Sequence, residues 1–164
     1  YEDTGLAQLF GMPFVVLRKP VPFDTTTLNF NWQVWDTKAF SLYSRSTEKI
    51  DKKGADMAIA AVCRFLSRMN VLNYNVYGGY ESTVLIEEEL VSLRSTASGL
   101  YIPHVKSFDS VERGQVLADI IDPLTGVTVV QTEAPEDGIV FFAKDSPLVM
   151  ENETLFKIVN KLHK

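Results

Sequence analysis

The chain has 164 residues, of which 46% are hydrophobic, and this is enough for one domain or two small domains with an apolar core. The 16 Lys and Arg against 21 Asp and Glu give a formal net charge of −5 without a basic block, which argues against a nucleic-acid partner. The single cysteine, Cys63, cannot form an internal disulfide and favours a reducing, cytoplasmic location. No apolar run approaches the ~18 residues of a membrane helix, so we expect no membrane partner.

The first half of the chain alternates short apolar runs with helical patterns. Phe14–Leu17 is an unbroken apolar run after a Gly-Met-Pro breaker, and it predicts a buried strand. The apolar spacing over residues 28–35, after the capping residues 24–27, favours a helix, although the alternation over 30–34 also fits a strand.

Ala39–Tyr43 predicts a second strand, and residues 44–49 a polar loop at its carboxyl end, where α/β sheets bind ligands. Asp51 is a candidate N-cap for a helix that ends near Met69. Its predicted apolar stripe consists of Ile59, Val62, Cys63, Leu66 and Met69. Strand, helix, strand and helix predict part of a parallel α/β sheet, with too few strands for a complete domain. We therefore expect exposed apolar surface on the two predicted strands.

The Gly, Asn and Tyr residues of segment 73–80 predict a domain boundary, with one domain over residues 1–80 and a second over 81–164. Short strands separated by turn signals follow this boundary. Three adjacent acids, Glu87 to Glu89, interrupt the first of these strands and indicate a solvated strand face or bulge.

The second half contains one motif written twice, over Val111–Ile120 and Val149–Ile158. Gly114 and Asn152 share a turn position where a positive φ is expected, because Gly and Asn tolerate it best. A glycine precedes an apolar strand in each copy, at Gly99 and Gly138. The matched apolar pairs are Val111 with Val149, Leu117 with Leu155, and Ile120 with Ile158.

Motifs for chemistry are scarce. The two histidines, His104 and His163, have no metal-binding partner at useful spacing, so we expect no metal site in this chain alone. No nucleophile elbow and no phosphate-binding loop occurs. Biotinyl and lipoyl carriers have a lysine between two such repeats, whereas residues 122–137 contain none, which excludes a carrier role.

Several segments occur in the order found in a known family. In the second half they are Ser98–Leu100, Val111–Leu117, Ala134–Val140 and Pro147–Val149, and in the first half Phe10–Val16, Ala39–Tyr43 and Ile50–Asp51. Through them the chain resembles the C-terminal portion of the succinylglutamate desuccinylase/aspartoacylase family, relatives of the zinc carboxypeptidases. The resemblance implies an α+β fold, in which a partial carboxypeptidase-like α/β sheet precedes an all-β barrel-sandwich module with an internal two-fold repeat.

The resemblance also implies a zinc-dependent deacylase that hydrolyses an amide of an N-acyl amino acid or a similar small molecule. The family's zinc ligands would precede this chain, so a missing N-terminal segment or a partner chain is expected to carry them. The chain alone is expected to be inactive and to form homo-oligomers. A non-catalytic relative that binds a ligand or serves in assembly is the alternative.

Tyr43 occupies the position that the family resemblance assigns to the catalytic glutamate, eight residues before Asp51. A phenol with a pKa near ~10 is a poor general base at neutral pH but can donate a hydrogen bond to an oxyanion. Three readings stay open: Tyr43 is a repurposed site residue, it marks an inactive relative, or the alignment slips and Glu48 serves. Arg45 either binds a substrate carboxylate or is a solvated loop residue.

Overall fold

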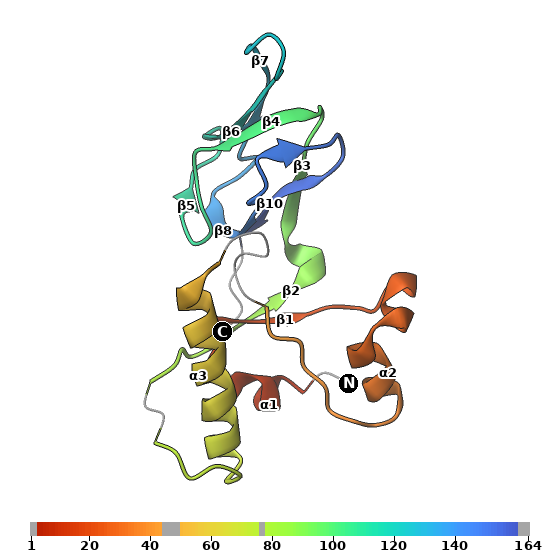
Figure 1. The fold of residues 1–164 in the computed structure, drawn as a ribbon, viewed down its shortest axis with the longest axis vertical. Coiled ribbons are helices and arrows are strands. Elements are labelled where there is room, and N and C mark those ends of the chain that lie inside the picture. The colour runs from red at the N-terminus through yellow and green to blue at the C-terminus, as the bar shows by residue number, and fades with distance from the viewer. Residues whose placement is uncertain (1–2, 44–49, 76–77, 161–164) are drawn as a thin grey trace. The chain divides into compact units, whose positions relative to one another are not determined.

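The structure, a computed structural model, describes residues 3–43, 50–75 and 78–160. The described chain divides into two compact units between Glu88 and Glu89 (Figure 1). The strand that follows the expected boundary at residue 80 pairs within the first unit. The units are described separately below.

The first unit is built around a two-stranded parallel sheet. Strand β1 (Phe14–Leu17) pairs with β2 (Thr83–Ile86), and Phe14 lies opposite Thr83. The helical segments are α1 (Thr4–Gln8), η1 (Pro22–Thr26), α2 (Leu28–Val34) and α3 (Lys52–Arg68), and a 3₁₀ turn, η2 (Glu87–Glu89), follows β2. Because parallel strands need a long crossover, the segment that holds α2 and α3 supplies it. A mixed helix-and-sheet fold is confirmed.

Side-chain caps fix the starts of both long helical patterns. The Thr27 hydroxyl accepts a hydrogen bond from the Phe30 amide at 3.3 Å, and this confirms the predicted helix over its strand alternative. The Asp51 carboxylate accepts one from the Gly54 amide at 3.0 Å, which confirms it as the N-cap of α3. Each cap satisfies an amide that has no partner within its own helix.

The predicted strand Ala39–Tyr43 is wrong, since residues 37–43 have no regular secondary structure. Phe40 instead packs in an aromatic cluster, 5.7 Å between ring centroids from Phe10 and 6.4 Å from Phe65. Phe10 and Phe65 stack at 4.2 Å. Phe40 is therefore half-buried by aromatic packing, whereas a strand would also have required a backbone partner.

The predicted stripe on α3 is correct only in part. Cys63 and Leu66 are half-buried, but Ile59, Val62 and Met69 are exposed. The buried residues of this part of the helix are Ala61 and Arg64. The Arg64 guanidinium donates hydrogen bonds to the carbonyls of Phe10 and Gly11. A buried arginine satisfied in part by backbone carbonyls was not evident from an apolar pattern.

Glycines make room for the Arg64 side chain. A Cβ at Gly11 would lie 2.9 Å from Arg64 Cδ, and one at Gly79 would lie 2.8 Å from its Nε. Both glycines have positive φ, 61° and 109°. The Tyr80 amide also donates to the Gly11 carbonyl at 2.9 Å, so this contact ties the segment before β1 to the segment before β2.

The second unit consists of two four-stranded antiparallel sheets. The first has the order β3-β10-β8-β5 and the second β7-β6-β4-β9. The strands are β3 (Val91–Arg94), β4 (Gly99–Pro103), β5 (Ser110–Val111), β6 (Val116–Ile121), β7 (Thr128–Glu133), β8 (Gly138–Ala143), β9 (Leu148–Val149) and β10 (Thr154–Val159). Residues of both sheets share one apolar core, in which the ring centroids of Tyr101 and Phe156 lie 6.0 Å apart. No strand pairing closes the sheets into a barrel within residues 89–160.

The matched apolar residues of the two motif copies all lie in this core, at 0–3% exposure. Gly114 and Asn152 have the expected positive φ, 80° and 68°. Gly99 and Gly138 begin β4 and β8 as expected, and each lies against the backbone of another strand. A Cβ at Gly138 would meet Val159 O at 2.6 Å, and one at Gly99 would meet Ile121 O at 2.5 Å.

The two units bury very different amounts of apolar surface. Among described hydrophobic residues of the first unit, only Phe10, Ala61 and Leu85 are buried. On the predicted strands, Val16 is 40% exposed and Leu42 38%, whereas Phe14, Val15, Leu17 and Phe40 are half-buried. The expected exposure is therefore present in part. None of the described helices is long and apolar enough to span a bilayer.

Gly138→Ala should destabilise the chain by about 1–3 kcal/mol, because the new methyl group overlaps both the Val159 carbonyl and the Ile158 side chain. Urea unfolding followed by circular dichroism measures the loss. Gly5→Ala is the matched control, since its nearest neighbour would be 3.9 Å away. Equal midpoints for Gly138→Ala and the wild type would contradict the close approach.

Candidate functional site

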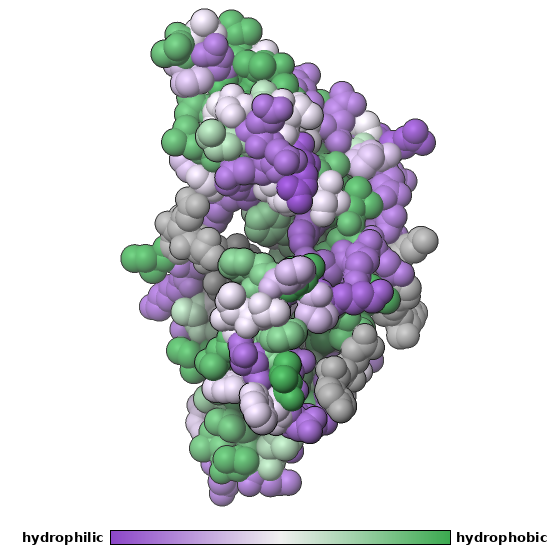
Figure 2. Space-filling view, turned by 90° about the vertical axis from the view of Figure 1, so that its right-hand side faces the viewer, coloured by the Kyte–Doolittle hydropathy of each residue, from purple (hydrophilic) through white to green (hydrophobic). Residues whose placement is uncertain are grey.

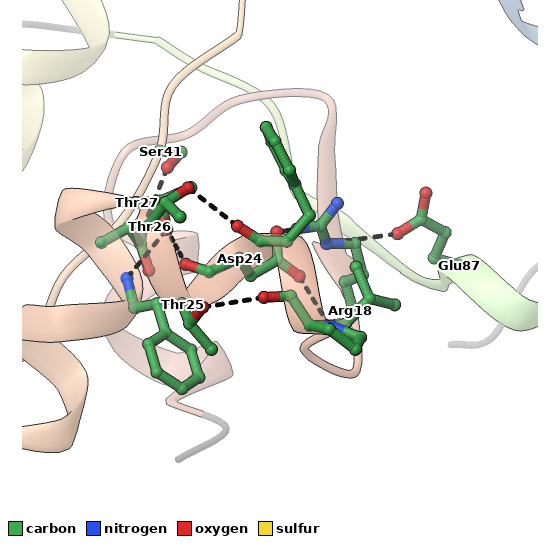
Figure 3. A network of polar contacts seen from close by, with 12 residues as sticks. Arg18, Asp24, Thr25, Thr26, Thr27, Ser41 and Glu87 are labelled. Carbon is green, nitrogen blue, oxygen red and sulfur yellow. Dashed lines mark hydrogen bonds and ion pairs between the residues drawn. The ribbon is translucent and has the colours of Figure 1, made fainter.

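Charged side chains gather where β1 and β2 end. Arg18 follows β1 and Glu87 follows β2, and parallel pairing brings both strand ends to one edge of the sheet. The Arg18 guanidinium pairs with Asp24 through Nη2 and with Glu87 through Nε, at 3.5 Å to Oε2 (Figure 3). This is the edge at which ligands bind in open α/β sheets.

Asp24 is the most enclosed member of this network, at 6% exposure. Its second carboxylate oxygen accepts a hydrogen bond from the Val21 amide at 2.7 Å. Three hydroxyls stabilise the surrounding turn by donating to carbonyls three residues earlier, from Thr25 to Pro22, Thr26 to Phe23 and Thr27 to Asp24 (Figure 3). The buried carboxylate thus holds the loop after β1 against the sheet edge.

The network is compensated in charge, because one guanidinium faces two carboxylates. The Arg18 side chain is 49% exposed and the Glu87 side chain 26%, so both remain accessible to solvent. Lys19 adds an exposed pair with Glu88 at 3.9 Å. This arrangement can orient a loop and offer a guanidinium donor to an anion.

Of the residues predicted from the sequence for the site, the structure describes Tyr43. Tyr43 lies in an irregular segment and is 79% exposed. Arg45 and Glu48 lie outside the described residues. Sequence reasoning missed Arg18 and Asp24, although one signal was present: Arg18 directly follows a predicted strand, the position at which ligand-binding residues occur in α/β sheets.

The acidic run Glu87 to Glu89 forms a 3₁₀ turn between β2 and β3, and not a strand face. Two of its carboxylates pair with the basic residues that follow β1. Within residues 3–43, 50–75 and 78–160, no three His, Cys, Asp or Glu side chains cluster closely enough to bind a metal ion. The described residues therefore do not fit a zinc site.

A second polar cluster lies on the second unit. His104 Nε2 is 2.8 Å from Asp119 Oδ2, and the Gln131 amide donates to Asp119 Oδ1 at 2.9 Å. The Gln131 hydrogen bond, and then that of His104, hold the pKa of Asp119 below its ordinary value of 3.8. Asp119 is therefore a solvent-accessible carboxylate with two hydrogen-bond partners, His104 and Gln131.

Solved structures share the fold. A succinylglutamate desuccinylase from Silicibacter sp. TM1040 matches 98% of this chain with a TM-score of 0.79 at 15% identity. A succinylglutamate desuccinylase/aspartoacylase from Rhodobacter sphaeroides and the product-bound ectoine utilization protein EutE (DoeB) from Ruegeria pomeroyi each match 94% with a TM-score of 0.76, at 15% and 13% identity. The chain spans 51%, 47% and 47% of these three chains.

No family model matches the sequence, and no curated protein matches it. Since all three identities are below 20%, the comparisons establish a common fold. The predicted resemblance to the succinylglutamate desuccinylase/aspartoacylase family is confirmed at that level, over about half the length of those proteins.

Asp24→Asn should lower the free energy of unfolding by about 1–3 kcal/mol, since the buried Arg18 contact and the Val21 amide lose a charged acceptor. Chemical denaturation of the full 164-residue chain measures the effect. Asp56→Asn, on the exposed face of α3, is the matched control and should change the midpoint little. Equal losses of unfolding free energy in Asp24→Asn and Asp56→Asn would contradict a stabilising role for the network.

Asp119 should contribute a pH-dependent stability. Because its folded pKa lies below the unfolded value, the contribution is complete above the unfolded pKa and is lost as the pH falls through the folded pKa. Asp119→Asn should therefore flatten the fall in unfolding midpoint between about pH 5 and pH 2.5. The control Glu112→Gln should retain the wild-type slope, and an unchanged slope in Asp119→Asn would contradict the assignment.

Proposed function

We propose that this chain is part of a zinc-dependent hydrolase of the succinylglutamate desuccinylase/aspartoacylase family, which cleaves an amide of an N-acyl amino acid or a similar small molecule. The observation that carries this proposal is the likeness to family structures along 94–98% of the chain. The ordered sequence segments support it independently, because they lie in both units. The chain alone is inactive in this proposal.

The zinc ligands lie outside the described residues in this proposal, on a further segment or on a partner chain. The scarcity of buried apolar residues in the first unit supports such a partner. Large apolar side chains are left in solvent there, among them Phe23 at 78%, Trp32 at 50% and Trp35 at 82% exposure. A soluble unit rarely exposes this much apolar surface unless another surface covers it.

The second unit is an internal repeat of the barrel-sandwich type in this proposal. Support comes from the strand orders. The repeat matches β4 with β8, β5 with β9 and β6 with β10, and the strands that remain are β3 and β7. Exchanging the matched strands, and β3 with β7, converts the order β3-β10-β8-β5 into the order β7-β6-β4-β9. The short strands β5 and β9 each follow the long strand of one sheet and pair in the other. The functional parts expected from the sequence, residues 1–80 and 81–164, differ from the two compact units, since β2 pairs with β1 and belongs to the first unit.

Tyr43 is the residue on which the chemistry depends. Its exposed phenol can donate a hydrogen bond to the oxyanion that forms when water attacks the amide carbonyl. In the alternative alignment Glu48, and not Tyr43, is the catalytic residue and serves as general base. Arg45 is the proposed ligand for a substrate carboxylate. A non-catalytic relative is the second candidate, and the observation that favours it is a tyrosine in place of the expected glutamate.

The complete protein, meaning this chain with its natural flanking sequence, should bind zinc and hydrolyse members of a panel of N-acyl amino acids, and the 164-residue chain alone should do neither. Tyr43→Phe should lower kcat about 100-fold with a smaller effect on KM, because a transition-state donor is lost. Metal analysis and steady-state kinetics measure both. Tyr74→Phe, also an exposed tyrosine, is the matched control.

A folded complete protein without zinc or turnover would favour the binding alternative over the hydrolase. Full activity in Tyr43→Phe together with loss of activity in Glu48→Gln would instead assign the general base to Glu48. Isothermal titration with the same N-acyl amino acids then separates a binding module from an assembly module.

A further inference from the structure

Strand β7 has one open edge. It lies at the end of the sheet order β7-β6-β4-β9 and pairs only with β6 among the described strands. Its six residues, Thr128–Glu133, form half of a hairpin that projects from the rest of the second unit (Figure 1). An open edge presents unpaired backbone donors and acceptors to any strand that can align with it.

The other sheet edges in residues 89–160 are shorter. Strands β5 and β9 have two residues each, and β3 has four and ends at Arg94. In contrast, β7 contains no lysine, arginine or proline, and its one charge, Glu133, lies at its end. Lysine and proline, which keep edges apart, are therefore missing from the longest edge of the unit, and its irregularity is the register shift against β6 between residues 128 and 130.

The side chains of β7 suit pairing with an identical strand. Val129 is 53% exposed on the outer face, while Val130 packs against the core from the inner face. In an antiparallel pair centred on Val130, Val130 faces its own copy and Val129, which lies at the register shift between β6 and β7, faces Gln131. Glu133 then faces Val127, and no like charges are opposed.

We propose that β7 is a self-association site, at which a second copy of this chain adds its own β7 in antiparallel orientation. The sheet that contains β7 in one copy and the same sheet in the second copy then form one continuous sheet of eight strands, since each contributes four. A second copy is the partner that brings an equally long open edge, and its two-fold symmetry closes both edges at once. No other strand described here offers this match.

The surface beside this edge extends the same interface. At the hairpin turn, Val127 is 61% exposed and Leu124 93%. Apolar side chains are visible at this end of the second unit, at the top of Figure 2. Burial of Val127 and Val129 therefore adds apolar contacts to the backbone hydrogen bonds.

The test is sedimentation equilibrium of the full 164-residue chain over a concentration series that reaches about 100 µM, where weak edge interfaces are populated. The wild type should form a reversible dimer, and Val129→Lys should weaken its association at least about tenfold, because a charge would enter the edge. Leu148→Lys, on β9 at the opposite edge of the same sheet and 61% exposed, is the matched control and should change it less than about twofold.

Val129→Glu should reproduce the effect with the opposite charge, provided that circular dichroism shows the native fold. Hydrogen exchange gives a second readout, since β7 amides of the wild type should gain protection as the concentration rises. A chain that stays monomeric would overturn the proposal, as would a dimer weakened equally by Val129→Lys and Leu148→Lys. Neither result depends on zinc or hydrolysis, so the proposed function is tested separately.

Discussion

The parallel pairing of β1 with β2 determines the first unit, because it joins segments about 70 residues apart. The pairing removes β2 from the run of antiparallel strands that follows it. It also brings Arg18 and Glu87 to the same sheet edge, where the guanidinium can pair with Asp24 as well. The Arg18–Glu87 pair would not form if β2 continued into the second unit, since the two charges would then have no common edge. The Arg18–Asp24 pair is local to the segment after β1.

The first unit is held by polar and aromatic contacts more than by a large apolar core. Arg64 binds backbone carbonyls beside two glycines, and Phe10, Phe40 and Phe65 form an aromatic cluster. Such contacts stabilise particular loops but leave large apolar side chains in solvent. Because burying apolar surface is the main favourable term in folding, a unit of this kind gains much from a covering partner. This exposed apolar surface is the physical support for the covering segment or partner chain that we propose.

The second unit shows the opposite balance. Its matched valines, leucines and isoleucines fill one core between two sheets, and small glycines permit the strands to approach closely. In this unit the outer edge of β7 has no neighbouring strand among those described, and the groups exposed along it are polar backbone donors and acceptors. The partners that we propose for the two units therefore differ. An apolar surface covers the first unit, and an extended strand pairs with the second.

The sequence by itself determined the helix caps at Thr27 and Asp51, the turn positions at Gly114 and Asn152, and the apolar core of the second unit. These features depend on residues close together in the chain or on a repeated pattern, so local rules suffice. Tertiary structure decided the rest. The segment 39–43 is apolar enough for a strand, yet Phe40 packs against aromatic rings and the segment pairs with no described strand. The face that α3 buries, the pairing of β2 and the Arg18 network all depend on contacts between distant segments, and no local pattern specifies which distant segment will be adjacent.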